Sequence, residues 1–289
     1  MTSSPQIGTL GEDVLIPTRD GRRLRAMVAG PDSDTLVILE AGLGVSGLYW
    51  LPVHRLLSQR FRVVAYDRAG LGGSDPTDLP RTLSNLADDL VTVIEAFPHR
   101  QVILVGHSWG GPIVRVAAAR RLAAGCGDIA GLVLADQSDE NDVLFYQAGA
   151  RLNFAVVAAV MSVLALFARV VPLPRLVLRR RSPLRQAMVE AIATQKSLQA
   201  FAAEMRVAIA ELEWLRDQPA ELGAVPIRVL SGQLTRRFDK KNRANLLRGH
   251  RITVENYAGA VYVPAQASGH MIPLTEPELI ADQVSELAG

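Results

Sequence analysis

Five short apolar runs constrain the fold of this chain more strongly than any other feature. Each run is five or six residues long and has no polar face, which is typical of strands buried on both sides in a parallel sheet. Segments with helical spacing of apolar residues lie between them, as in TLSNLADDLVTVIEAF (82–97). This alternation predicts an α/β fold, with a mostly parallel twisted sheet and helices on both faces. The runs are TLVILE (35–40), RVVAY (62–66), QVILV (101–105), GLVLA (131–135) and IRVLS (227–231).

The region from about residue 140 to 220 interrupts this alternation. It contains long helix-like segments and no convincing buried strand. We therefore predict three parts: 1–139 as the first part of an α/β core, 140–220 as an inserted helical cap or lid, and 221–289 as the rest of the core. With 289 residues and 49% hydrophobic content, the chain is long enough to fill such a core.

The first part of the predicted cap contains an unusually long apolar run, LNFAVVAAVMSVLALFARVV (152–171). Its 20 residues carry one charge, Arg169, and are enough to span a bilayer. A single crossing would put residues 1–150 and 172–289 on opposite sides and would split the sheet, so we favour lid helices that line an apolar pocket. The neighbouring cluster RLVLRRRSPLR (175–185) keeps a third interpretation open, a peripheral contact between the cap and a membrane.

Composition excludes several classes of function. Thirty-one basic and 29 acidic residues give a net charge of +2, so no global field favours nucleic acid. The single cysteine, Cys126, has no partner for a disulfide, and no His, Cys and Asp grouping has metal-ligand spacing, so we expect neither a metal nor a cofactor. The N-terminal MTSSPQIGTLGED does not resemble a secretion signal, so we expect a cytoplasmic protein, with membrane association left open. The sequence does not set the oligomeric state.

A serine lies between a predicted strand and a predicted helix in VILVGHSWGG (102–111). Gly106 and Gly110 supply small size where a sharp turn brings backbone segments together. A nucleophile must present its hydroxyl to both a substrate and a base, and this G-x-S-x-G arrangement holds Ser108 exposed on the turn. We therefore predict that Ser108 is a nucleophile.

His270 is the best candidate for the base. It lies in ASGHMIP, a loop between the last predicted strand, AVYVPAQ, and the final predicted helix, EPELIADQVSEL. This position leaves the imidazole free to reach Ser108. The remaining histidines are not expected to take part in the reaction. We expect His107 to be a packing residue and His54, His99 and His250 to be exposed side chains.

Four segments together resemble the α/β-hydrolase family. AGLGVSGLYW, YDRAGLGGSD, GHSWGG and SGHMIPLTEPE occur in the order and spacing of that family, and the resemblance covers about three-quarters of the chain, leaving the cap poorly matched. It implies an α/β-hydrolase fold with a helical cap. It also implies an esterase-type serine hydrolase in which Ser108 is the nucleophile, His270 is the base, and an acid lies between them in the sequence.

The acid is where this chain departs from the family pattern. Most members place it shortly after the strand that corresponds to IRVLS, and here that site reads SGQLT and ends in Thr235. A neutral hydroxyl stabilises an imidazolium poorly. We favour Asp136, directly after GLVLA, because catalytic groups in parallel sheets gather at the carboxyl ends of strands. Asp239, Asp139 and Glu140 remain alternatives.

The resemblance also implies an oxyanion hole made of the backbone N–H groups of Trp109 and Leu43. In most relatives a histidine stands where Ala41 is, so the loop that contains Leu43 must be supported differently here. Glu40 is a candidate for that support, and an unrelated structural role is an equal alternative. Asp67 and Arg68, in YDRAGLGGSD, are expected to brace the fold rather than react.

These residues predict hydrolysis of a small carboxylic ester through an acyl-enzyme. The cap is rich in Val, Leu, Ala, Met and Phe and has few charges before Arg175, which favours a substrate with an apolar acyl or alcohol part. A proline-iminopeptidase-like peptidase is one alternative, because G-x-S-W-G is similar to that group as well. A non-catalytic ligand-binding protein on the same fold is the other. The cap carboxylates available to a peptidase are Glu190, Glu204, Glu211 and Glu213.

Overall fold

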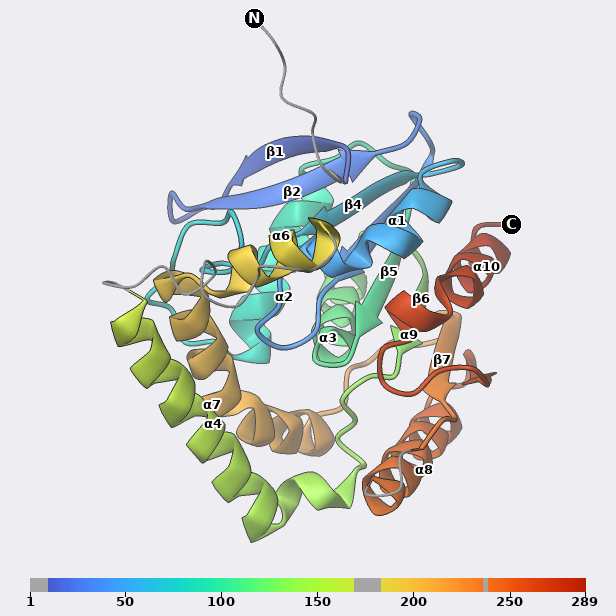
Figure 1. Cartoon of the computed structure of the whole chain (residues 1–289). Helices are drawn as coiled ribbons and strands as arrows, with labels where there is room; N and C mark the ends of the chain where they lie inside the picture. The colour runs from blue at the N-terminus through green and yellow to red at the C-terminus, as the bar shows by residue number, and fades with distance from the viewer. Residues whose placement is uncertain (1–9, 169–182, 236–238) are drawn as a thin grey trace, which may run out of the picture.

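An eight-stranded sheet forms the centre of the molecule (Figure 1). The computed structural model describes residues 10–168, 183–235 and 239–289. The strand order is β1-β2-β4-β3-β5-β6-β7-β8, in which β1–β2 and β2–β4 pair antiparallel and all other neighbours pair parallel. The predicted mostly parallel sheet is therefore confirmed. The strands are β1 (Glu12–Pro17), β2 (Arg23–Ala29), β3 (Thr35–Glu40), β4 (Arg62–Tyr66), β5 (Gln101–His107), β6 (Ile129–Ala135), β7 (Ile227–Gly232) and β8 (Ala260–Ala265).

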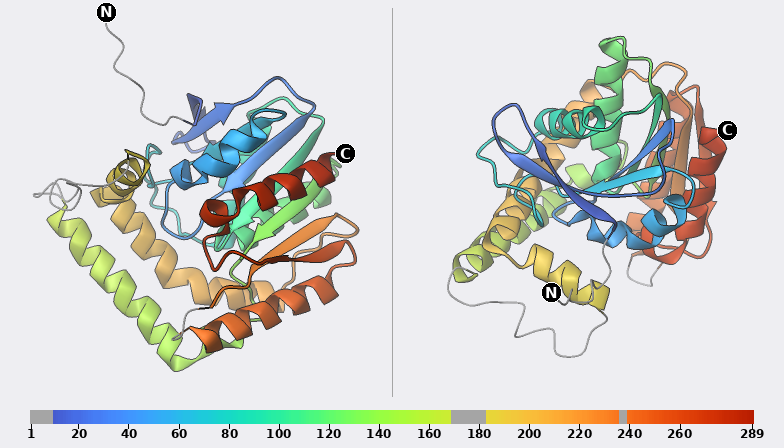
Figure 2. Two further views of the ribbon diagram at one scale, coloured as in Figure 1. Left: turned by 45° about the vertical axis from the view of Figure 1, so that its right-hand side comes forward. Right: turned by 90° about the horizontal axis from the view of Figure 1, so that it is seen from above.

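Helices cover both faces of the sheet, as predicted (Figure 2). The strand β3 shows why its sequence has no polar face. Leu36 and Ile38 belong to the core on the side of α2 and α3, whereas Val37 and Leu39 belong to the core on the side of α1 and α10. The helices that follow core strands are α1 (Leu51–Leu57), α2 (Leu83–Glu95), α3 (Gly110–Ala123), α8 (Lys240–Asn256), α9 (Ile272–Thr275) and α10 (Pro277–Ala288).

The strand order creates a crevice at one edge of the sheet. The chain passes from β3 to β4 on one side and then returns to β5 on the other side of β3. The loops that follow β3 and β5 therefore diverge from each other at the carboxyl ends of these strands. In open α/β sheets this switch point is where ligands bind.

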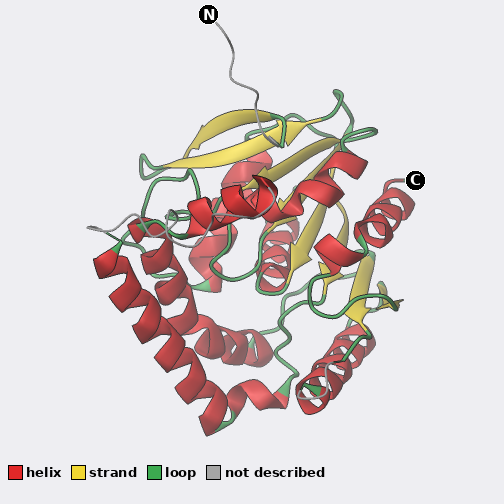
Figure 3. Ribbon diagram, in the orientation of Figure 1, coloured by secondary structure: helices red, strands yellow, loops and turns green. Residues whose placement is uncertain are grey.

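Helices are the only regular secondary structure in the described residues between β6 and β7 (Figure 3). They are η2 (Val143–Tyr146), α4 (Ala148–Phe167), α6 (Pro183–Ile192) and α7 (Gln195–Asp217). The long helices α4 and α7 lie side by side (Figures 1 and 2). We call this segment, residues 140–220, the cap, and its boundaries as a separate unit stay a prediction. The end of the apolar run (169–171) and most of the arginine cluster (175–182) lie outside the described residues.

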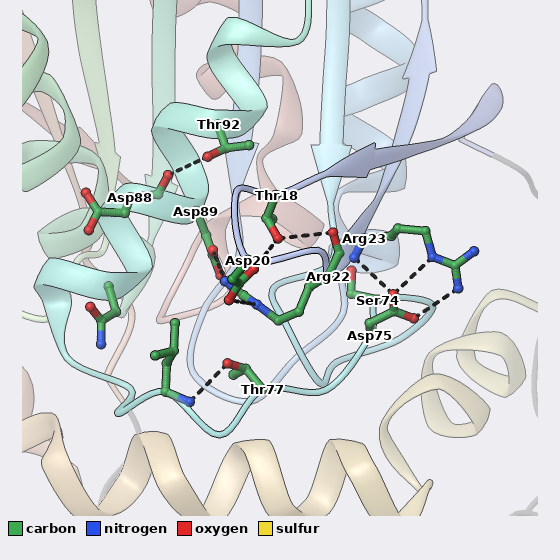
Figure 4. A network of polar contacts seen from close by, with 12 residues as sticks. Thr18, Asp20, Arg22, Arg23, Ser74, Asp75, Thr77, Asp88, Asp89 and Thr92 are labelled. Carbon is green, nitrogen blue, oxygen red and sulfur yellow. Dashed lines mark hydrogen bonds and ion pairs between the residues drawn. The ribbon is translucent and has the colours of Figure 1, made fainter.

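Ion pairs anchor the turn of the β1–β2 hairpin to the rest of the molecule (Figure 4). Arg22 donates two hydrogen bonds, of 3.1 and 2.9 Å, to the carboxylate of Asp89 on α2. Its neighbour Arg23 donates to Asp75 through both its backbone N–H and its Nε, at 2.9 and 3.0 Å. These contacts lie away from the crevice and stabilise the antiparallel edge of the sheet.

Candidate active site

Ser108 occupies a strained turn at the crevice. The strand β5 ends at His107 and α3 begins at Gly110, and Ser108 between them has a φ of 54°. A Cβ at Gly106 would lie 2.5 Å from the carbonyl oxygen of Gly110, and a Cβ at Gly110 would collide with the carbonyl oxygen of Glu40. The two glycines are therefore required by close backbone approach, which is the reason predicted for them.

His270 and Asp136 come together at the same edge of the sheet. Asp136 directly follows β6, and His270 lies in the loop between β8 and α9. The His270 Nδ1 and the Asp136 Oδ2 are 2.8 Å apart, a hydrogen-bond distance. Asp136 has a φ of 43°, and it and Ser108 are the two non-glycine residues with positive φ in the described part of the chain. Backbone strain of this kind, about 1–3 kcal/mol per residue, gathers at functional sites.

Asp136 is held as a buried anion. Its side chain is fully buried and accepts hydrogen bonds from the backbone N–H of Gly232 at 2.9 Å and from the Nη1 of Arg243 at 2.6 and 2.8 Å. Burial opposes ionisation, but the hydrogen bonds from His270 and Arg243 and the imidazole of His250 hold the pKa of Asp136 well below its usual range. The carboxylate is therefore ionised at neutral pH.

The other predicted acids are engaged elsewhere. Glu140 accepts two hydrogen bonds from Arg115, at 2.8 and 2.5 Å. Asp139 accepts from Thr253 at 2.7 Å and from Asn141 at 2.9 Å. Asp239 precedes α8, and no hydrogen bond joins it to His270 within the described residues. Asp136 is thus the carboxylate that contacts the histidine.

A cavity of about 410 Å³ connects these residues with the cap. Ser108, Asp136 and His270 all line it. Most of its remaining lining is apolar, and seven of these apolar residues come from the cap: Phe145 of η2, Phe154 of α4, Met188 of α6, and Phe201, Met205, Ala208 and Leu212 of α7. A pocket of this size and polarity is typical of a small-molecule site. Of the long apolar run, only Phe154 lines the cavity among the described residues, so the run is not the pocket lining that we predicted.

The cavity also contains two backbone N–H groups without an acceptor. Leu43 and Trp109 both line it, and within the described residues neither N–H donates a hydrogen bond to the protein. The N–H groups on either side of Leu43 are satisfied, since Gly42 donates to the Tyr49 hydroxyl at 3.1 Å and Gly44 donates to Glu204 at 2.8 Å. Both N–H groups are therefore available to a ligand in the cavity that Ser108 lines.

A buried ionic network supports the loop that carries Leu43. Arg68 donates to the carbonyl oxygens of Ala41 and Gly42, both at 2.7 Å, and to the Oε1 of Glu40 at 2.7 Å. It also pairs with Glu204 of α7 at 2.8 and 2.9 Å. The predicted support from Glu40 therefore acts through Arg68.

Sequence reasoning missed the structural role of Glu204, which it named only as a cap carboxylate available to a peptidase. Its side chain is fully buried, and it accepts a further hydrogen bond from Arg81 at 2.7 Å. Burial opposes its ionisation, but Arg68 and Arg81 lower its pKa to about 2. The available signal was its spacing: Glu204 follows Phe201 by three residues and precedes Ala208 by four, so it lies on the apolar stripe of its helix.

A polarised hydrogen-bond chain joins the loop of Leu43 to the loop of His270. Burial lowers the pKa of His107 to about 3, so its imidazole is neutral. Its Nε2 lies 2.8 Å from the carbonyl oxygen of His270, which can only accept, so the Nδ1 accepts from the Tyr49 hydroxyl at 3.1 Å. That hydroxyl in turn accepts from Gly42. His107, predicted as a packing residue, thus fixes both loops.

Three further histidines differ from the prediction. His99 is partly buried, and its Nε2 lies 3.0 Å from the Oδ2 of Asp128. His54 and His250 are buried rather than exposed. His54 contacts the carbonyl oxygen of Met27 at 3.3 Å, and His250 contacts that of Gln137 at 2.9 Å and the Oγ of Ser231 at 2.6 Å. Each ring therefore has a polar partner, which is the condition for burying an imidazole.

The strand order, and a cavity at the switch point of the sheet, define an α/β protein with a small-molecule site at the carboxyl ends of its strands. Residues 36–283 match the Alpha/beta hydrolase family, and the chain therefore belongs to that family. Solved structures agree with the fold. An esterase from Exiguobacterium antarcticum superposes with a TM-score of 0.70 at 19% identity, covering 96% of this chain and 100% of the other. A thermophilic esterase from Thermogutta terrifontis gives 0.67 at 19% identity, covering 96% and 98%.

Relatives with higher identity match only part of the chain. RutD of Caulobacter sp. (strain K31), named as a proposed carbamate hydrolase, is 45% identical over 84 residues, which are 28% of this chain and 31% of RutD. The 3-oxoadipate enol-lactonase 1 of Acinetobacter baylyi is 31% identical over 98 residues, 34% of this chain and 36% of the lactonase. The chain thus spans about a third of the length of these relatives.

Proposed function

We propose that this protein is a serine hydrolase that cleaves carboxylic esters with apolar groups through an acyl-enzyme. The observation that carries the proposal is the joint placement of Ser108, the His270–Asp136 pair and two unpaired N–H groups on the wall of one apolar cavity. Family membership and the names of the relatives support hydrolysis in general. The choice of nucleophile, acid and substrate is our own.

The reaction would run in two halves. The Ser108 Oγ attacks the ester carbonyl carbon while the Nε2 of His270 takes its proton, and the oxyanion accepts hydrogen bonds from the N–H groups of Leu43 and Trp109. Asp136 accepts the Nδ1–H of His270 and stabilises the imidazolium. Collapse breaks the ester C–O bond, and His270 returns the proton to the leaving alcohol. Water then attacks the acyl-enzyme by the same route and releases the acid.

The surroundings of His270 suggest how the ester lies. The apolar cavity with Ser108 suits the acyl part. A second pocket of about 690 Å³ adjoins it and shares His270, Phe145, Phe154 and Leu246 with it. Because His270 must protonate the leaving oxygen, the alcohol part lies on this side. The second pocket carries polar side chains, among them Gln147, Asn153, Lys241 and Asn242, so it accepts a polar alcohol.

A fluorophosphonate probe tests the nucleophile. We expect covalent labelling of the wild type and none of Ser108→Ala, with a set of p-nitrophenyl esters of increasing acyl length turned over only by the wild type. Equal labelling of both proteins would refute the assignment. Since two relatives are named for a carbamate and an enol-lactone, the substrate panel should include both classes.

The same experiment addresses the two alternatives. A non-catalytic binding protein would bind esters without turnover. A peptidase of the proline-iminopeptidase type needs cap carboxylates in the cavity, and within the described residues none of the four that we considered lines it. Of these, Glu204 is paired with two arginines and Glu213 pairs with Arg151. The geometry therefore favours the esterase.

A further inference from the structure

The outward side of α4 carries the main group of exposed apolar side chains in the described residues. Six of the thirteen large apolar side chains that are exposed there lie on this one helix. Their exposed fractions are between 46% and 66%. A contiguous apolar surface of this kind marks an interaction site. The six residues, which we call the outer face of α4, are Leu152, Val156, Val160, Val163, Leu166 and Phe167.

The polarity of α4 is inverted relative to that of an ordinary surface helix. The side that packs on α7 presents small residues, with Ala158 and Ala165 buried and Ser162 accepting a hydrogen bond from Arg206 of α7 at 2.6 Å. The large aliphatic side chains recur every three or four residues on the opposite side. A helix in water turns its apolar stripe inward. The outer face of α4 is therefore suited to an apolar medium.

A passage of α4 straight through a bilayer conflicts with the sheet. The helix is long and apolar enough for a span, and 11% of its apolar window is buried. However, β6 and β7, which flank the cap in the sequence, pair directly with each other from Leu132↔Ile227 onward. Both ends of the cap are therefore attached to one sheet and must lie on the same side of a bilayer. No second helix in the described residues is long and apolar enough to bring the chain back. The helix would therefore lie along a membrane surface.

The charge of the surrounding sequence identifies the kind of surface. Residues 143–189 contain seven arginines and no Asp, Glu or Lys, a charge of +7 in a chain whose total is +2, so the rest of the chain carries −5. One arginine, Arg151, lies near the start of α4, where it pairs with Glu213 of α7 and is still 47% exposed, and Arg169 follows the last residue of α4 by two positions in the sequence. Arginines that adjoin an apolar helix in the sequence are a combination that binds anionic lipid headgroups. We propose that the outer face of α4 docks flat on the surface of a bilayer that contains anionic lipids.

The proposal does not depend on ester hydrolysis, but it gives the cavity a source of substrate. Phe154, on the same helix, lines the cavity from the other side. A docked α4 would separate the cavity from the lipid by about one helix diameter, ~10 Å. An apolar compound dissolved in the bilayer would then lie close to the site.

Sedimentation with vesicles tests the proposal on the full chain. The wild type should bind vesicles of phosphatidylcholine with phosphatidylglycerol, bind pure phosphatidylcholine less, and lose binding at high salt. The triple variant Val156→Gln, Val160→Gln, Val163→Gln should bind the vesicles at least about tenfold more weakly than the wild type, because three half-exposed apolar side chains no longer enter the membrane interface. None of the three lines the cavity, so turnover of a soluble ester should not change.

A matched variant controls for general surface effects. Leu15→Gln, Leu79→Gln, Val261→Gln removes three apolar side chains of similar exposure, 50%, 47% and 48%, from other parts of the molecule. It should bind vesicles like the wild type. Equal loss in both variants, no binding to either vesicle, or binding that the α4 variant leaves intact would overturn the proposal.

Two further outcomes would assign the face to another occupant and would also overturn the proposal. The first is a wild-type dimer in solution without lipid that the α4 variant converts to a monomer. The second is vesicle-bound protein that high salt and alkaline carbonate do not release and that only detergent extracts, which indicates a span. Circular dichroism of both variants excludes unfolding as the cause of lost binding.

Discussion

Replacing Glu204 by Gln should weaken both the fold and the oxyanion site, because one buried carboxylate serves both. It accepts from Gly44 beside Leu43, and it pairs with Arg68 and Arg81. A pKa lowered from 4.5 to about 2 means that the folded protein favours the charged form by about 3 kcal/mol. Gln keeps an oxygen for Gly44 but leaves the arginines without this charge. Unfolding free energy should fall by about 3 kcal/mol, and the melting temperature by roughly 5–10 °C.

The pH dependence of this loss distinguishes the ion pair from ordinary packing. The folded pKa of Glu204 lies below its unfolded value, so the stabilisation is fully present above about pH 4.5 and disappears as the pH falls toward 2. The difference in unfolding free energy between wild type and Glu204→Gln should therefore be constant at neutral pH and shrink on acidification. Urea titrations from pH 7 to about pH 3 measure it.

Turnover supplies the second readout. Displacement of the Leu43 N–H should lower kcat with little change in KM, by at most the ~3 kcal/mol of one lost oxyanion donor, a factor of about 100. Glu211→Gln, on the same helix, is the control, since Glu211 bonds to the N–H of Leu83 away from the loop. A stability difference that does not change with pH, or an unchanged kcat, would refute the coupling that we infer between the cap and the loop that carries Leu43.

Three other predictions test single features of the molecule. Asp136→Asn should keep its fold but lower kcat by up to ~10⁴-fold, because the wrong imidazole tautomer is allowed, whereas Asp239→Asn should turn over normally; the reverse result would place the acid after the later strand. Burial lowers the pKa of His54 to about 4, so unfolding free energy should fall by about 1.4 kcal/mol per pH unit from pH 6.5 toward 4, and His54→Gln should lack that contribution in urea titrations; parallel curves for both proteins would contradict the assignment. Gly106→Ala should destabilise by more than about 2 kcal/mol through the clash at 2.5 Å, while Gly149→Ala, with no atom within 4 Å of its added Cβ, should be neutral or stabilising by up to ~1 kcal/mol in the same titrations.

The sheet was predictable because its strands are buried on both faces. A strand such as β3 needs apolar residues at every position, and this leaves a signal in the sequence that depends on no distant partner. The turn that carries Ser108 was predictable for a related reason. Its glycines are required because a Cβ would collide with backbone atoms a few residues away or on the neighbouring strand.

Features that depend on distant partners were not predictable in the same way. Glu204 and Arg68 are 136 positions apart. A carboxylate on an apolar stripe indicates that it needs a buried partner, but the sequence does not indicate which arginine pairs with it. Whether the large residues of α4 face inward or outward depends on what α7 presents to it. Hydropathy reports only that the run is apolar, so the sequence led us to assign to the cavity a face that the structure turns outward.

The two unusual features of the cap act on opposite sides of it. On the inner side, Glu204 joins α7 to the loop that contains Leu43, so the cap cannot move away from the core without separating a buried carboxylate from two arginines, at a cost of several kcal/mol. On the outer side, α4 rests on α7 and exposes its apolar face. Docking of α4 on a membrane would therefore leave the cap fixed on the core. A substrate that moves from the lipid to Ser108 would have to pass around Phe154, because no lid would open. Glu204→Gln distinguishes a fixed cap from a moving lid. If a moving lid limits access, the variant should loosen the cap and speed the entry of bulky esters. If the cap is fixed, the variant should only lower kcat.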